Sequence, residues 1–547
     1  MLSIHRFDRL LLSLIALLLA RGAQAQSFRV QCPAGTLAHP ADVTKDPAVT
    51  TAAARAQYST YTQWGRTDGK LNPTPAMANP AIKCQQVAGG DGYATMGDGT
   101  QSYLFGFGPL SGLAEIYAGR PGTQLARDFV QVSPTGQGTP STLVGMPDAG
   151  FTFNGAIGLV PDPESTPPNQ LTGHVDPRPI MDVGVMNASE PAPLMAIDED
   201  DEFFLTLTNV GMIMRPDLFE QHTVHFHGYP NASAFYDGVP DASVAINIGG
   251  SFSYYYLAPD AGTYFWHCHI SPPEHLQMGM VGQLYVRPRQ NKVAPGGSLY
   301  AGLVAQQADL RTRSDCTADI LCPSPLPPTN AATRAATGGY AYNDGDGSTH
   351  YDVEYPLQIH GFDPNFHFVG MTFNPESFTD MKDKYFLLNG RSYPDTVGGA
   401  STPGANVAGP MQTMSSDGTK HTSQPLPSVI NIPVNGRALL RISDLSVTEY
   451  ATLASLGIPM RVIGLNARLL RDQAGGDMTY LTNSITLAGG ESLDVILDAT
   501  GYTAGQKFYL YTPNLDHLSN DAENFGGLMT EVNVCTTVDP ATKACTL

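Results

Sequence analysis

The chain has 547 residues, a formal net charge of −20 at pH 7 and only 15% charged side chains. Such an acidic surface repels nucleic acid and anionic lipid and favours cationic partners or metal ions, although simple solubility explains the charge equally well. The composition therefore argues against nucleic-acid binding, and the length allows two domains with additional loop insertions.

The first residues have the pattern of an export signal. Arg6 and Arg9 precede an apolar run at 10–20, and residues 23–25 (Ala-Gln-Ala) form a small-x-small cleavage pattern. The run is too short to span a bilayer, so residues 1–25 are predicted to be a secretory signal peptide. No later segment approaches the length of a membrane helix. We expect an exported protein, periplasmic or secreted, with no membrane span.

Short β-branched or aromatic segments between Gly, Pro and Asp turns predict an all-β protein built of sandwiches. The clearest of these segments are 202–210, 251–258, 283–288, 492–499 and 507–513. Residues 26–90 and 110–180 are rich in Pro, Thr, Ala and Gly and are expected to form long loops. A similar passage at about 290–350 is expected to connect two domains.

Seven cysteines leave one without a partner in an exported protein. Cys316 and Cys322 are close in sequence, as are Cys535 and Cys545, and Cys32 with Cys84 would complete three bridges, although spacing does not fix connectivity. Cys268 lies between two histidines and is the cysteine left over. A free thiolate there is better explained by metal binding than by pairing.

Soft metal ligands concentrate in two stretches, QHTVHFHG at 221–228 and YFWHCHISPPEHLQMGM at 264–280. Successive side chains on a strand point to opposite faces. His225 and His227 therefore share one face, and His222 lies on the other.

In the second stretch the same alternation places His267 and His269 on one face and Cys268 on the opposite one. Pro272 and Pro273 break the strand, so the chain can turn back toward Cys268. Two groups of ligands result if the strands are neighbours. The outer group comprises His222, Cys268, His275 and Met280, and the inner group comprises His225, His227, His267 and His269.

The outer group has the composition of a blue copper site, with two imidazoles, one thiolate and a distant thioether. Zinc is the competing metal, but zinc sites rarely recruit methionine, and their usual Cys-x₂₋₄-Cys pairing is missing. Met280 is the predicted axial ligand, since it follows His275 by five residues with Gly279 just before it. Met278 is better explained by packing.

The inner group contains four imidazoles and no thiolate. A single His-x-His pair is weak evidence, but two pairs that flank the outer ligands are much less expected by chance. An electron at the Cys268 sulfur needs to cross only one residue to reach His267 or His269. The pattern predicts an outer metal that collects electrons and an inner metal site that uses them.

These stretches resemble the multicopper oxidase motifs H-x-x-H-x-H-G and H-C-H…H-x₄-M. Residues 237–269, DGVPDASVAINIGGSFSYYYLAPDAGTYFWHCH, are similar to that family's D-G…G-x-S-F-x-Y…G-T-Y-x-x-H run. The resemblance implies two cupredoxin-like Greek-key β-sandwich domains with long loop insertions. It suggests a loop-rich segment at 26–94, a copper-binding domain at 95–290, a linker at 291–349 and a second domain at 350–547 without recognisable copper ligands.

Carried over by motif, the outer group matches the family's type 1 copper ligands. His225 matches a type 2 ligand, and His227, His267 and His269 match type 3 ligands. Asp237 stands where the family often has an acid that relays protons, and an ordinary Asp-Gly turn explains it equally well.

The chain departs from the family in two places. The gap between Cys268 and His275 is two residues longer than usual, in a loop that we expect to tolerate it. The family's trinuclear cluster takes eight histidines from two domains, whereas these motifs supply four. Arg461 stands where copper nitrite reductases, a related family, have a histidine. The resemblance thus implies an inner site that is completed between subunits of a homo-oligomer or is smaller than usual.

The leading interpretation is an exported copper oxidoreductase in which type 1 copper accepts electrons and passes them through Cys268 to the inner site, with oxygen as the acceptor. The alternative is a blue-copper electron carrier or copper-binding protein without turnover. A structural sandwich with a remnant site is disfavoured by the intact outer group. The reductant stays open between phenols, metal ions such as Cu(I), Fe(II) or Mn(II), and a redox protein.

Overall fold

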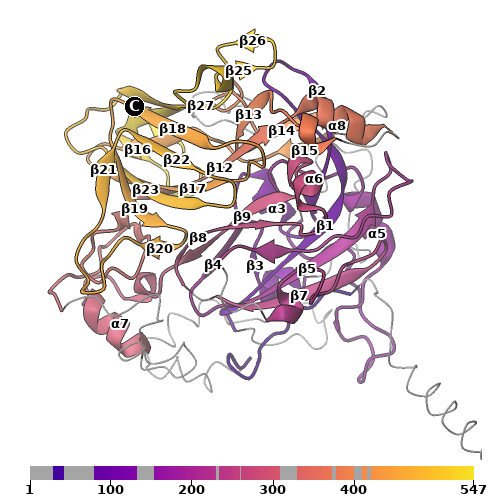
Figure 1. The fold of residues 1–547 in the computed structure, drawn as a ribbon. Helices are drawn as coiled ribbons and strands as arrows, with labels where there is room; N and C mark the ends of the chain where they lie inside the picture. The colour runs from indigo at the N-terminus through magenta and orange to yellow at the C-terminus, as the bar shows by residue number, and fades with distance from the viewer. Residues whose placement is uncertain are drawn as a thin grey trace, which may run out of the picture.

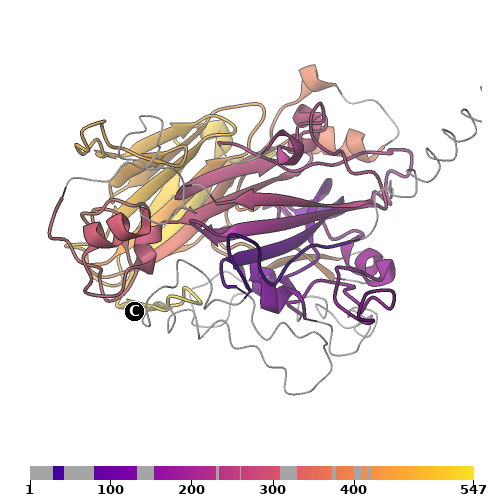
Figure 2. The same cartoon turned by 90° about the horizontal axis from the view of Figure 1, so that it is seen from below.

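The computed structural model describes residues 29–41, 79–131, 153–228, 233–258, 260–307, 329–372, 377–398, 410–414 and 420–547. The expected signal peptide and the pair Cys316 and Cys322 lie outside these ranges. The described residues form two β-sandwiches, the first purple to magenta and the second orange to yellow in Figure 1. They lie beside each other and remain separate in the view from below (Figure 2). The predicted all-β class with two sandwiches is confirmed.

The first sandwich consists of two sheets around an apolar core that includes Phe107 and Trp266. One sheet has the order β2(Gln101–Pro109), β1(Ile82–Thr95), β5(Glu202–Gly211) and β7(Ser251–Leu257), with β3(Gln124–Leu125) paired to β1. The other has the order β4(Met195–Asp198), β9(Val281–Arg287), β8(Gly262–His267) and β6(His225–Phe226).

The first sandwich begins earlier than the sequence suggested. β1 starts at Ile82, inside the segment 26–94 that was expected to be loop-rich. The glycines of β1 are typical of a loop sequence, but in this strand they stand where neighbouring atoms leave no space for a side chain. A Cβ atom at Gly92 would lie 2.8 Å from the carbonyl oxygen of Ala188, which leaves no room for a side chain.

The second sandwich has its own core of branched aliphatic side chains. Its larger sheet has the order β20(Arg468–Leu469), β19(Met460–Leu465), β23(Ser492–Asp498), β17(Arg437–Asp444), β12(Val353–Phe362), β13(Tyr385–Leu388), β25(Ser519–Asn520) and β26(Glu523–Asn524), and β21(Tyr480–Thr482) pairs with β19. The smaller sheet has the order β16(Ile430–Pro433), β27(Met529–Cys535), β24(Lys507–Tyr511), β18(Ala451–Leu456) and β22(Ser484–Leu487).

Short elements occupy the connections. The helices are α3(Leu113–Tyr117), α4(Ala126–Phe129), α5(Pro177–Gly184), α6(Pro272–Gln277), α7(Leu299–Gln307) and α8(Pro364–Met371), with 3₁₀ turns at η6(Ala234–Tyr236), η7(Arg289–Lys292), η8(Phe378–Asp380) and η9(Leu515–His517). Three hairpins are β10(Gly339–Tyr340) with β11(His350–Tyr351), β14(Met411–Met414) with β15(Lys420–Gln424), and β28(Thr537–Val538) with β29(Cys545–Thr546). No helix among the described residues is long and apolar enough to cross a membrane.

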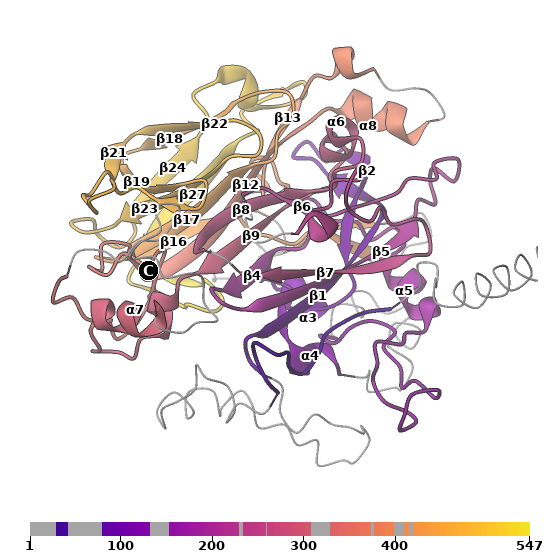
Figure 3. The ribbon, with the colours of Figure 1, turned by 60° about the horizontal axis from the view of Figure 1, so that its bottom comes forward.

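Segments of the second half reach back onto the first sandwich. Helix α8 packs against β2, and Phe366 of α8 belongs to the first core. Helices α6 and α8 lie next to each other at the same end of the molecule (Figures 1 and 3). The loop that follows β8 is therefore covered by residues that lie far away in the sequence.

Two disulfides join described cysteines, Cys32 with Cys84 and Cys535 with Cys545. Both match pairs suggested by the sequence. Cys268 is free and buried.

Candidate metal centres

Strands β6 and β8 position both ligand groups. They pair antiparallel with His225 directly opposite His267, and β9 lies on the other side of β8 (Figure 3). Strand β8 ends at His267, and the chain then folds back on itself. The Cys268 amide donates to the Met280 carbonyl at 3.1 Å, and the Met280 amide donates to the His275 carbonyl at 2.8 Å. This closed loop, residues 268–280, is called the copper-type loop below.

The structure brings three members of the outer group together. Ligand atoms of His222, Cys268 and His275 all lie within 4.8 Å of one another, and the three side chains are fully buried. His275 Nδ1 is 3.3 Å from Cys268 Sγ, and the Thr223 amide donates to the same sulfur at 3.4 Å. Met280 is buried in the same core cluster as Cys268.

Helix α6 explains how His275 reaches the thiol. Strand β8 ends at His267, and Pro272 and Pro273 start the helix shortly after it, as their fixed backbone angles favour. The helix turns the chain so that His275 faces inward, with its ring edge against Phe105 at a centroid distance of 5.2 Å. Gly279 then takes a backbone φ of +111°, which favours glycine and lets the chain return to Met280. Met278 is fully buried in the core cluster.

The electrostatics of the outer group favour a thiolate. Burial raises the pKa of the Cys268 thiol, but the charge of His275 and the proximity of both histidines to the sulfur outweigh burial and hold it well below its ordinary value. Burial lowers the pKa of His275, and the Cys268 charge more than offsets this, so that the pKa is raised to about 10. A deprotonated sulfur is the form that binds a metal.

The inner group lies on the other side of the same strands. Ligand atoms of His225, His227 and His267 lie within 4.8 Å of one another, with His227 Nε2 at 3.0 Å from His267 Nε2. The His269 ring is 5.0 Å from the His225 ring, centroid to centroid. All four predicted residues thus occupy one cluster, as the alternation of faces indicated.

Hydrogen bonds and burial prepare these imidazoles as neutral ligands. His267 Nδ1 is 2.6 Å from the Cys268 carbonyl oxygen, which leaves Nε2 directed at His227. Burial and neighbouring histidines lower the pKa of His227 to about 4, and burial holds the pKa of His267 well below its ordinary value. Neutral imidazole is the state that ligates a metal.

Asp237 lies at the edge of the inner group. Its carbonyl oxygen is 2.7 Å from His225 Nδ1, and its carboxylate Oδ2 is 3.6 Å from the same nitrogen. The carboxylate is about one third exposed, with 35% of its side-chain area accessible. It therefore connects the histidine face with solvent.

Two neighbours of the groups were not identified from the sequence. Glu220 Oε2 lies 3.6 Å from His275 Nε2 and is partly exposed; its position two residues before His222 was an available signal. Gly490 comes from the second sandwich, and a Cβ atom there would lie 2.9 Å from the His227 ring. No local pattern marks Gly490, because the contact is purely tertiary.

The second sandwich supplies no further histidine to the inner group within the described part of the chain. Three of its buried histidines bond elsewhere: His360 contacts Glu190, His367 contacts two carbonyl oxygens, and His517 contacts Glu449. Arg461 is exposed and donates to Thr479 Oγ1 at 3.1 Å.

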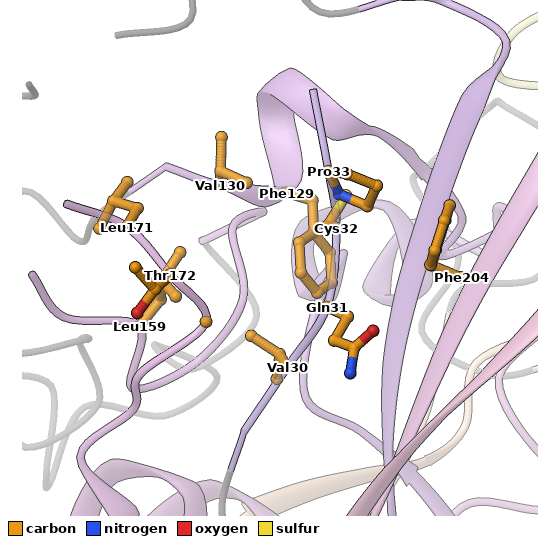
Figure 4. A pocket seen from close by; sticks show the side chains of 11 residues that line it. Val30, Gln31, Cys32, Pro33, Phe129, Val130, Leu159, Leu171, Thr172 and Phe204 are labelled. Carbon is orange, nitrogen blue, oxygen red and sulfur yellow. The ribbon is translucent and has the colours of Figure 1, made fainter. Parts of the chain in front are cut away.

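A separate apolar cavity of about 260 Å³ lies beneath the N-terminal segment (Figure 4). Val30 and the disulfide-bonded Cys32 line it together with Phe129, Leu159 and Phe204. None of its lining residues belongs to either ligand group.

Comparison with known proteins identifies the part of the chain that contains these groups. The family model described as "Multicopper oxidase" matches residues 172–291, which include all eight histidine, cysteine and methionine residues of the outer and inner groups. Multicopper oxidase MCE of Talaromyces pinophilus is 33% identical over 116 residues, 21% of this chain and 18% of that protein. The copper-containing nitrite reductase of Rhizobium meliloti is 34% identical over 109 residues, 19% of this chain and 26% of that protein.

The matched part therefore spans under a fifth of the length of the first multicopper oxidase and laccase relatives. The solved blue copper oxidase from Nitrosomonas europaea is similar over 82% of this chain and 85% of its own, at 16% identity and a TM-score of 0.45. The family resemblance read from the sequence is confirmed for the domain at 172–291.

Proposed function

Because residues 172–291 form a multicopper oxidase domain, we propose that this protein is an exported copper-dependent oxidoreductase with a type 1 copper site in the outer group. The observation that carries the proposal is the convergence of His222, Cys268 and His275, all fully buried, within 4.8 Å of one another. Met280 is the proposed axial ligand, because the copper-type loop returns it to Cys268.

The residues present fit copper. Both ring nitrogens of His222 are buried without a hydrogen-bond partner. His275 Nε2 is buried as well, and the Glu220 carboxylate that faces it is 3.6 Å away. Buried polar atoms are normally paired, so a metal ion accounts for the state of His222. Two imidazoles with a thiolate and a thioether suit both copper oxidation states.

The inner group is proposed to hold type 2 or type 3 copper, with His225 as the type 2 ligand and His227, His267 and His269 as type 3 ligands. Copper in the two groups would supply one-electron transfer from a reductant to oxygen, with the Cys268–His267 and Cys268–His269 links as the connection. Asp237 is proposed to hold and release protons, which its position between His225 and solvent supports.

A second candidate function is a blue-copper electron carrier. It is favoured by one observation: the described residues of the second sandwich add no histidine to the inner group. In that case the outer group would exchange electrons with a partner, and the four inner histidines would hold one non-catalytic ion or none.

Copper content per chain, combined with electron paramagnetic resonance of the oxidised protein, tests the proposal. A type 1 signal together with a type 2 signal and more than one copper per chain supports the oxidoreductase. A type 1 signal alone, at one copper per chain, supports the electron carrier. Copper-loaded protein without a type 1 signal contradicts both.

Export is proposed from the two disulfides, because disulfides persist mainly in oxidising compartments. Thiol titration of the unfolded, copper-free chain tests this point. We expect one reactive thiol, that of Cys268, and three or more free thiols in the exported protein would contradict it.

A further inference from the structure

One buried side chain connects the copper-type loop to the second half of the chain. Gln277 ends helix α6, two residues after His275 and three before Met280, and it is fully buried. Its Nε2 donates to Asp383 Oδ1 at 2.8 Å, and its Oε1 accepts from the Asp363 amide at 3.4 Å.

The main chain of Gln277 is held as well. Its carbonyl oxygen is 2.8 Å from His367 Nε2 on helix α8. Both side-chain polar atoms and the carbonyl group of this residue thus contact residues 363–383, which lie about a hundred positions later in the sequence.

The partners of Gln277 are themselves fixed. Asp363 caps helix α8 by accepting from the amides of Asn365 and Phe366. Asp383 also accepts from the Thr448 hydroxyl through its other oxygen. The His367 ring stacks on Phe362 at 3.5 Å, centroid to centroid. The contacts therefore belong to a rigid frame rather than to mobile surface groups.

A second buried contact bounds the loop on the far side of Gln277. A Cβ atom at Gly279 would lie 2.8 Å from Glu190 Oε2, and Glu190 Oε1 is bonded to His360 Nδ1 at 2.9 Å. The segment between His275 and Met280 is thus bounded on one side by residues of the second half and on the other by Glu190, which His360 of the second half contacts.

We propose that Gln277 is a positioning residue through which the second sandwich fixes His275 and Met280 relative to Cys268. This inference rests on the proposed type 1 site. It gives the sandwich without copper ligands a role: it supplies the outer support of the metal loop. Groups that orient ligands typically contribute about 10- to 100-fold to metal affinity.

The chain offers a matched control. Gln283 on β9 is equally buried and also donates across the domain boundary, to the Arg441 carbonyl and to Ser443 Oγ, each at 2.9 Å. It lies outside the copper-type loop. Gln277→Leu and Gln283→Leu each remove one buried side-chain amide that contacts the second half. A difference between the two variants therefore measures the effect on the copper-type loop and not the loss of a domain contact in general.

The experiment compares full-length wild type, both leucine variants, Asp383→Ala and Asp383→Asn. In copper-free protein, we expect amide hydrogen exchange of residues 272–280 to quicken in Gln277→Leu and Asp383→Ala only. In copper-loaded protein, the same two variants should show a shifted blue absorption band and about tenfold weaker copper retention against a chelator. Asp383→Asn keeps an acceptor for Gln277 and should restore the wild-type values.

If Gln277→Leu and Gln283→Leu change the band, the affinity and the exchange equally, or not at all, the inference is wrong. If Gln277→Leu does not fold, Asp383→Ala and Asp383→Asn decide in the same way. The inference then requires that these two variants differ in the hydrogen exchange of residues 272–280 and in the blue band. A wild-type protein without a blue band would instead overturn the proposed function, while the exchange measurement on copper-free protein would still report the support of the loop.

Discussion

Two buried polar clusters of this molecule are alike in burial and differ in geometry. The outer group and a cluster at the domain boundary (Glu190, His360, Asp383 and Asp444) are both almost completely buried. Both contain polar atoms without hydrogen-bond partners, such as the ring nitrogens of His222 in one and His360 Nε2 in the other. Of these two clusters of described residues, the outer group alone brings three ligand atoms within 4.8 Å of one another, as the inner group also does.

The difference shows that convergence, and not burial alone, distinguishes a metal-type site. In the outer group a strand, a loop and a short helix direct a thiol and two imidazoles to one point. In the boundary cluster each acid faces its own partner, as Glu190 faces His360 and Asp383 faces Gln277. Burial there raises the pKa of Asp444 to about 7 and that of Asp383 to about 6, so these two carboxyl groups keep their protons to a higher pH than ordinary aspartates do.

The largest expected effect follows from removing the thiol. Cys268→Ser should abolish the blue charge-transfer band completely, because the thiolate is the donor of that band, while circular dichroism shows a folded protein. The double variant Cys535→Ser, Cys545→Ser is the control, since it removes a disulfide far along the chain and should keep the band. Retention of the band in Cys268→Ser would contradict the type 1 assignment.

The next largest effect concerns turnover. The inner group has four histidines, and a twofold contact between two copies of the first sandwich would bring more of them together. We therefore expect oxygen reduction only in an oligomer with this histidine face at or near the subunit boundary. Dilution or a boundary variant that gives monomers should keep the blue band and lose turnover. A strictly monomeric protein that reduces oxygen with full copper loading would contradict this.

The sequence predicted which of these side chains lie together, because alternation along a strand is a local property. His225 and His267 share a face in the structure because they are paired neighbours on β6 and β8. The start of the first sandwich was missed because the glycines of β1 imitate a loop. The boundary cluster and the contacts of Gln277 were not predictable, because residues 190, 277, 360, 383 and 444 meet only through the packing of the two halves.

A smaller effect is expected for Asp444→Asn, which tests whether protons occupy the boundary cluster. Folded Asp444 keeps its proton up to about pH 7, whereas an unfolded aspartate loses it near pH 4. The folded state therefore binds more protons in this window, and stability should fall as the pH rises from 4 to 7. Asp383 and His360, whose pKa values are also raised, act in the same direction.

Denaturant unfolding of copper-free protein at several pH values measures this dependence. Asp444→Asn should flatten it and gain roughly 2 kcal/mol relative to wild type between pH 4 and 7. The control is Asp498→Asn, whose carboxylate is partly exposed and has a lowered pKa, so that this variant should not flatten the profile. Equal profiles for wild type and Asp444→Asn would show that Asp444 is ionised in the folded protein.

The smallest expected effect is at Arg461, the position where the related nitrite reductases have a histidine. Its guanidinium is exposed and makes one side-chain hydrogen bond, to Thr479 on the same face of the second sandwich. Arg461→Ala should therefore change the free energy of unfolding by less than about 0.5 kcal/mol. The blue band and copper per chain should stay unchanged in the monomer, because no described residue of the second sandwich joins the outer or the inner group. A lower copper content in the oligomer alone would place Arg461 beside a neighbouring copy's histidine face. A lower copper content in the monomer would contradict the expectation that the copper ligands come from the first sandwich.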